Sequence, residues 1–204
     1  MEKKRPLVAL FDGYEKAVYL WGVIDFVFLA IFNVLEGKMI FLLYFVFIVL
    51  CYTLLYMIAP SRYYMTIFLL CIIEETIVYY MGGGLHGQAK SLIHDYLRSL
   101  PIFMAHAYLW RNFMSKYRYE DRHIFIMAGL HGFFWEIIIS GAIINPILTT
   151  LLGGTTFLLY GLLVLIPERP KGTEDVDLRK TIILWFYYLI IEIVIGVLFA
   201  ILFP

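Results

Sequence analysis

TIILWFYYLIIEIVIGVLFAILF, residues 181–203, is an apolar run of 23 residues that carries a single charged side chain, Glu192. A transmembrane helix needs about 20 predominantly apolar residues to cross a hydrocarbon core of roughly 30 Å. The run has this length and composition, and it predicts a membrane-spanning helix.

Similar runs recur along the chain, separated by short charged or Gly/Pro segments. Hydrophobic residues make up 62% of the sequence and charged residues only 16%, whereas soluble domains carry roughly 45–50% and about 25%. We therefore predict an all-α fold, a polytopic integral membrane bundle of about seven transmembrane helices that forms a single domain over residues 1–204. The predicted spans are 17–35, 39–59, 63–81, 99–115, 124–144, 154–167 and 181–203. The amphipathic stretch 85–98 is either an interfacial helix or the first turns of the fourth span.

The basic residues are distributed asymmetrically between the two sides of the predicted bundle. Cytoplasmic loops of membrane proteins carry an excess of Lys and Arg. Placing the N-terminus in the cytoplasm leaves only Lys38, Lys90 and Arg98 outside, out of 16 basic residues. We therefore expect a multi-pass protein of the cell membrane with a cytoplasmic N-terminus and an external C-terminus.

Ionisable side chains occur inside five of the predicted spans. At 1.5 Å per residue, each lies roughly 10–20 Å from the end of its helix. We therefore expect all of them in one slab around the midplane, with the glutamates of the third and fifth spans slightly toward the outer side. Each would cost at least about 2.5–3.5 kcal/mol if it faced lipid, and such residues mark functional sites by default. They are Asp25, Glu74, Glu75, His106, His131, Glu136 and Glu192.

The signs of these groups favour cation chemistry. Five are carboxylic acids and two are histidines, and no Lys or Arg shares their depth. Like charges and desolvation both disfavour ionised carboxylates, so the acids share protons or hold a cation. The sequence predicts a divalent metal ion of undetermined identity bound by Glu75, His106, His131 and Glu136. Asp25 and Glu192 would support the polar cavity, although a lone acid in a bundle also serves as a protonated hydrogen-bonding strut.

Helical periodicity restricts which groups can face one centre. His131 and Glu136 are five residues apart, about 140° around the helix, so they cannot both point inward without strain. Glu75 shares a stripe with Cys71 and Tyr79, which favours Glu75 over Glu74 for a core-facing role. Neither Cys71 nor the other cysteine has a polar setting in sequence, and we interpret both as packing residues.

Three segments carry a resemblance to a known family. IEETIVYY contains the adjacent Glu74 and Glu75, IFMAH brings His106 31 residues after Glu75, and LHGFFWE supplies His131. This pattern, in the middle third of the chain, resembles the CAAX prenyl endopeptidase and bacteriocin-processing family of intramembrane glutamate/histidine proteases. The resemblance implies a membrane-embedded hydrolase in which Glu74, Glu75, His106 and His131 are catalytic. Its substrate would be lipid-soluble, lipidated or embedded in the membrane.

Two other classes remain open from the residues alone. An acid-rich midplane cavity without basic partners also suits a transporter or channel for protons or metal cations, or an accessory subunit of one. A structural subunit, whose acids hydrogen-bond across helices, is the third hypothesis. The HExxH signature of zinc metalloproteases does not occur, and no basic patch with interleaved aromatic residues indicates nucleic-acid binding. The expected partners are the lipid bilayer and a membrane-soluble substrate.

Overall fold

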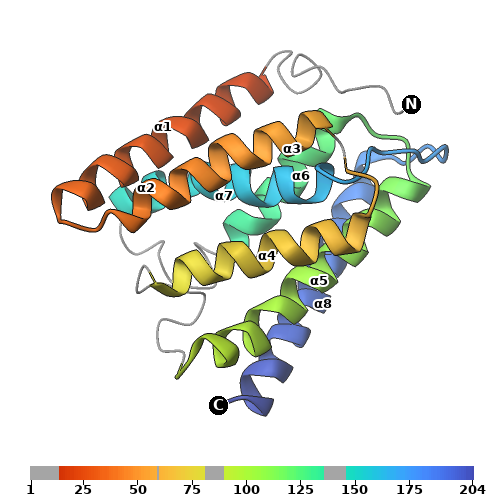
Figure 1. The fold of residues 1–204 in the computed structure, drawn as a ribbon. Coiled ribbons are helices and arrows are strands. Elements are labelled where there is room, and N and C mark those ends of the chain that lie inside the picture. Colours follow the sequence, from red (N-terminus) through yellow and green to blue (C-terminus); the bar gives the residue numbers. More distant parts are fainter. Residues whose placement is uncertain (1–13, 59, 81–89, 136–145) are drawn as a thin grey trace. The chain divides into compact units, whose positions relative to one another are not determined.

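A computed structural model describes residues 14–58, 60–80, 90–135 and 146–204 of the chain, and Figure 1 shows the course of its helices. Seven continuous helical segments account for most of these residues, and the described part contains no strand beyond one bridge pair, Tyr117 and Glu174. The predicted all-α class is confirmed. The chain divides into two compact units, one within residues 1–61 and 120–169, the other comprising 62–119 and 170–204.

The first unit is built around helix α7 (Pro146–Leu165). Helices α1 (Tyr14–Leu35) and α6 (Asp121–Phe133) pack against α7, as does a second segment that runs through α2 (Ile40–Phe45), η2 (Val46–Tyr52) and α3 (Thr53–Ile58). Small residues let these helices approach closely. A Cβ atom on Gly22 of α1 would lie 2.5 Å from the carbonyl oxygen of Gly154 of α7, so only glycine fits there.

The second unit consists of α4 (Tyr63–Tyr80), α5 (Leu92–Lys116) and α8 (Leu178–Leu202), with α5 packed against both other helices. The Tyr63 hydroxyl donates to the Ala107 carbonyl at 3.0 Å, and the hydroxyls of Thr76 and Tyr96 are hydrogen-bonded. As residue numbers increase along α4, the numbers of the contacted residues on α5 decrease, so the two helices are antiparallel. The same holds for α5 and α8, because Tyr119 bonds Thr181 where α8 begins.

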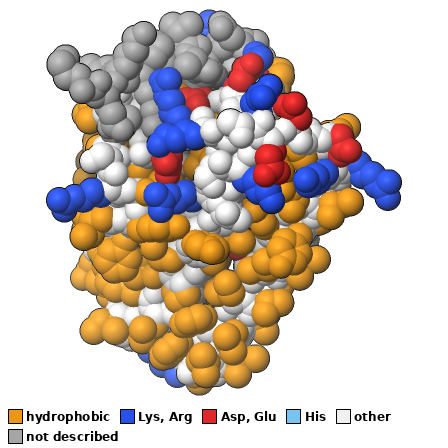
Figure 2. Space-filling model, turned by 90° about the vertical axis from the view of Figure 1, so that its right-hand side faces the viewer, with side chains coloured by type: hydrophobic (Ala, Val, Ile, Leu, Met, Phe, Trp, Pro, Cys, Tyr) orange, Lys and Arg blue, Asp and Glu red, His pale blue; other side chains and the backbone are white. Residues whose placement is uncertain are grey.

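Within the described part of the chain, four helical segments are long and apolar enough to cross a membrane: Tyr14–Leu35, Ile40–Ile58, Tyr63–Tyr80 and Leu178–Leu202. A shorter apolar segment, Gly153–Leu165, lies in α7. On the face shown in Figure 2, charged side chains gather in one band and hydrophobic side chains predominate below it. These features are those of a membrane protein, and the number of seven spans stays a prediction.

Two helices begin earlier than the predicted spans. Of the two alternatives for the stretch 85–98, the described residues agree with the second: residues 92–98 form the first turns of α5, which begins after the capping residue Ser91. The helix continues through Pro101 to Lys116, because packing against two helices stabilises it despite the missing backbone donor. Helix α7 begins at Pro146 rather than near residue 154. Proline is favoured in the first turn of a helix, where its missing N–H has no intrahelical partner.

Candidate functional site

The most buried charged contact of the second unit joins α5 to α8. His106 lies on the face of α5 that also buries Phe103 and Trp110, at helical spacing. On α8, the buried residues Trp185, Tyr188, Glu192 and Gly196 recur every three or four positions. The last three therefore share one face of α8.

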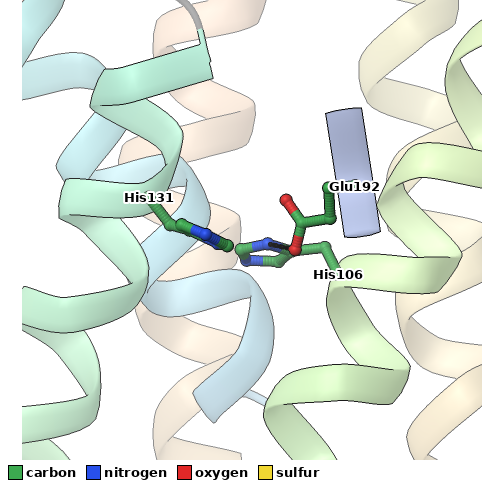
Figure 3. A group of neighbouring side chains, drawn as sticks. All are labelled: His106, His131 and Glu192. Carbon is green, nitrogen blue, oxygen red and sulfur yellow. Dashed lines mark hydrogen bonds and ion pairs between the residues drawn. The ribbon is translucent and has the colours of Figure 1, made fainter. Parts of the chain in front are cut away.

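The side chains of His106 and Glu192 meet directly. His106 Nδ1 lies 3.0 Å from Glu192 Oε1, and the two side chains are 1% and 0% exposed (Figure 3). With an ionised carboxylate, Nδ1–H donates to Oε1; with a protonated acid, the carboxyl O–H donates to the ring nitrogen. The contact can therefore hold its proton on either side.

Burial makes this pair sensitive to protonation. A buried ion pair forfeits the hydration of both charges, and removing one partner strands the other. Imidazole and carboxylic acid are also the two side-chain types that most readily exchange protons under physiological conditions when their surroundings shift them. The chemistry that fits the contact is reversible proton transfer.

Aromatic side chains form one wall beside the pair. The ring of Trp110 lies 6.0 Å from the His106 ring, and Tyr188 lies 6.3 Å from Trp110 in an edge-on arrangement. Apolar rings lower the local dielectric, which strengthens the interaction between the charged forms of His106 and Glu192.

A second polar contact joins α4 to α5. The carboxyl groups of Glu75 and Asp95 are hydrogen-bonded to each other, and Glu74 is buried beside Glu75. Both predicted glutamates are thus buried, although the stripe favoured Glu75 alone. Asp95 was placed by sequence only in the amphipathic stretch and was not predicted as a site residue.

Glu75 and His106 meet different partners along α5. Glu75 meets α5 at Asp95, 11 residues before His106, and 11 helical residues span about 16 Å. The sequence hypothesis placed both groups near the midplane from the span boundaries alone. Because the antiparallel register of α4 and α5 brings Thr76 to Tyr96, the glutamates lie toward the Ser91 end of α5.

The remaining predicted residues belong to the first unit or lie outside the described residues. Asp25 accepts a hydrogen bond from the Gly154 backbone N–H at 2.9 Å, so it holds α1 to α7. His131 is fully buried on α6. Glu136 lies outside the described residues.

Asp95 was missed by the sequence prediction, although periodicity could have found it: Asp95, Ser99, Ile102 and His106 are buried and follow one face of α5 at steps of three or four. Extending the fourth span back to residue 92 would have included Asp95 in that stripe.

No protein-family model, curated protein or solved structure matches this chain.

Proposed function

We propose that this chain is a multi-pass membrane protein that takes up and releases protons through the His106–Glu192 pair, as a proton-coupled transporter, a channel or a subunit of one. The observation that carries the proposal is the 3.0 Å contact between two buried side chains, one a base (imidazole) and the other a carboxylic acid. His106 is 14 residues from the start of α5 and 10 from its end. At 1.5 Å per residue it lies about 15–20 Å from either end of the helix.

The placement of basic residues supports the proposed topology of seven spans with the N-terminus inside. Lys171 and Gly172 donate backbone hydrogen bonds to Met114, which brings the loop before α8 to the end of α5. Lys116, Arg118 and Lys180 therefore lie at one end of the second unit, and Lys90 lies before the opposite end of α5. The positive-inside rule expects the end that carries the excess of Lys and Arg to face the cytoplasm.

A hydrolase is the second candidate. A carboxylate bonded to Nδ1 orients a histidine and supports it as a general base, and Glu192 has this relation to His106. The protease resemblance, however, requires the glutamate pair and the histidine to act on one water. Glu75 instead pairs with Asp95, about 16 Å along α5 from His106. This separation favours proton handling over peptide hydrolysis.

The metal hypothesis stays a prediction. Zinc accepts histidine nitrogen and carboxylate oxygen as ligands, and His106 and Glu192 are of these types. The further ligands proposed from the sequence are His131, which belongs to the first unit, and Glu136, which lies outside the described residues.

Proteoliposomes containing a trapped pH-sensitive dye test the proposal. Purified protein is reconstituted, a potassium diffusion potential is imposed with valinomycin, and the internal pH is followed. We expect proton uptake with the wild-type protein and none with His106→Gln or Glu192→Gln. Glu174→Gln, at an exposed position, serves as the matched control and should retain full uptake. Equal uptake by wild type, His106→Gln and protein-free vesicles would overturn the proposal.

The same preparation addresses the hydrolase candidate. A fluorogenic, prenylated peptide is added to the vesicles, and cleavage is followed without an imposed potential. Cleavage that requires both His106 and Glu192, together with absent proton uptake, would make the hydrolase the better account.

A further inference from the structure

The Glu75–Asp95 contact has a chemical requirement of its own. Two ionised carboxylates repel each other, and a hydrogen bond between two carboxyl groups needs one proton to be donated from one oxygen to the other. Glu75 is 2% exposed and Asp95 1% exposed. The pair is therefore a buried place where a proton is held between α4 and α5.

A second observation is the other oxygen of Asp95. Its Oδ2 atom is buried and makes no hydrogen bond, while the same carboxyl group is directed at Glu75. A buried carboxyl oxygen without a partner is costly. Protonation reduces this cost, so the unsatisfied oxygen favours a proton on the pair.

The charged groups around the pair come from both helices. On α5, His94 and Arg98 interact electrostatically with Asp95, and on α4 Glu74 is buried next to Glu75. The Arg98 guanidinium supports a charged carboxylate and Glu74 opposes a second one. This balance favours a Glu75–Asp95 pair that carries one negative charge and one shared proton.

The position of the pair along α5 indicates where its proton exchanges. Asp95 lies one helical turn from Ser91, which is exposed and caps the helix, whereas His106 lies three turns deeper. Both polar contacts involve α5, within one compact unit. The Glu75–Asp95 pair, here the shallow pair, is thus close to the helix end. The His106–Glu192 pair, here the deep pair, lies farther along the same helix.

We propose that Glu75 and Asp95 form a second proton-binding site, which receives protons at the Ser91 end of α5 and supplies the His106–Glu192 pair. In one cycle the His106–Glu192 pair first releases its proton to the solution at the opposite side. The shared proton then leaves the Glu75–Asp95 pair and is accepted by His106 or Glu192. The resulting pair of carboxylates then takes one proton from solution, which restores its hydrogen bond. Proton and charge balance without any co-reactant. This inference rests on the proposed function of the deep pair.

Infrared difference spectroscopy and proton uptake together test the inference. Wild-type protein in membranes should show a carbonyl band of a protonated carboxylic acid that shifts in D2O and disappears in both Asp95→Asn and Glu75→Gln. The same variants should slow proton uptake by about tenfold or more. Ser99→Ala is the matched control, because Ser99 is equally buried one turn away and carries no titratable group. It should keep the band and the uptake rate.

Two outcomes would overturn the inference without touching the deep pair. In one, the band persists in Asp95→Asn, so that the proton resides elsewhere. In the other, the band is lost but uptake stays at the wild-type rate, so that the pair is a static hydrogen bond. Failure of the proposed function is distinguishable, because wild-type protein would then show the band with no proton uptake at all. Melting temperatures of all variants identify any loss caused by misfolding, and the conservative Asp95→Glu variant should restore both the band and the uptake.

Discussion

His106 and Glu192 are 86 positions apart in the chain, yet Nδ1 of the imidazole lies 3.0 Å from Oε1 of the carboxyl group. The antiparallel packing of α5 against α8 brings them together at mid-helix, where water is excluded from both side chains. The contact links α5 to α8 within the second unit.

Removing one member of this pair should destabilise the protein strongly. Glu192→Ala strands His106 in a buried site, and breaking a buried pair costs about 3–5 kcal/mol when a charge is left behind. Glu192→Gln keeps an acceptor for Nδ1–H and should lose less stability. Unfolding of detergent-solubilised protein measures both changes, with the exposed Glu174→Gln as control. Equal stability of Glu192→Ala and the wild type would show that the hydrogen bond between His106 and Glu192 does not contribute to stability.

Alkaline pH should weaken the packing at the end of α5. Burial raises the pKa of Tyr119, whose hydroxyl is hydrogen-bonded to Thr181. Because the folded pKa lies above the unfolded value of about 10, folding favours the protonated phenol. The resulting stability is present below about pH 10 and is lost as the pH rises through the folded pKa.

The Tyr119→Phe variant isolates this effect. It lacks the titrating group, so its melting temperature should fall less steeply above about pH 10 than that of the wild type. Identical alkaline profiles for the two proteins would show that Tyr119 does not cause the loss.

Zinc binding is the direct test of the metal hypothesis from the sequence. A metal that binds only the folded protein stabilises it by RT ln(1 + [L]/Kd), and its ligands must be deprotonated. The hypothesis predicts that zinc raises the melting temperature more at pH 8 than at pH 6, and that His131→Ala and His106→Ala each abolish the rise. No shift with zinc, manganese or magnesium relative to chelator would remove the metal and leave the proton account unchanged.

Sequence patterns were most informative about composition and helix faces. The all-α class, the apolar segments and the shared face of Tyr188, Glu192 and Gly196 follow from run length and periodicity, which depend on local sequence alone. Pairing depends on tertiary register. Nothing in the local sequence around Glu75 shows that α4 meets α5 at Asp95, so this contact could not be predicted from local patterns.

The topology can be tested with single cysteines in a background that lacks Cys51 and Cys71. Thr173 and Lys38 are exposed loop positions, predicted to lie on the cytoplasmic and external sides, respectively. In intact cells, an impermeant maleimide should label Lys38→Cys and leave Thr173→Cys unlabelled until the membrane is permeabilised. The reverse pattern would invert the bundle, and labelling of both from outside would contradict the odd number of spans.

Under the proposed function, His106 exchanges its proton during proton uptake. Nitrogen NMR of the histidine ring observes this exchange directly. Protein labelled with 15N-histidine is studied in lipid bilayers, and His106→Gln assigns the signals of the site. Imposing a pH difference should convert the His106 ring nitrogens between two protonation states, and Glu192→Gln should suppress the conversion. The proposed proton exchange at His106 would be contradicted if its signal keeps one protonation state in wild-type protein while the vesicles take up protons.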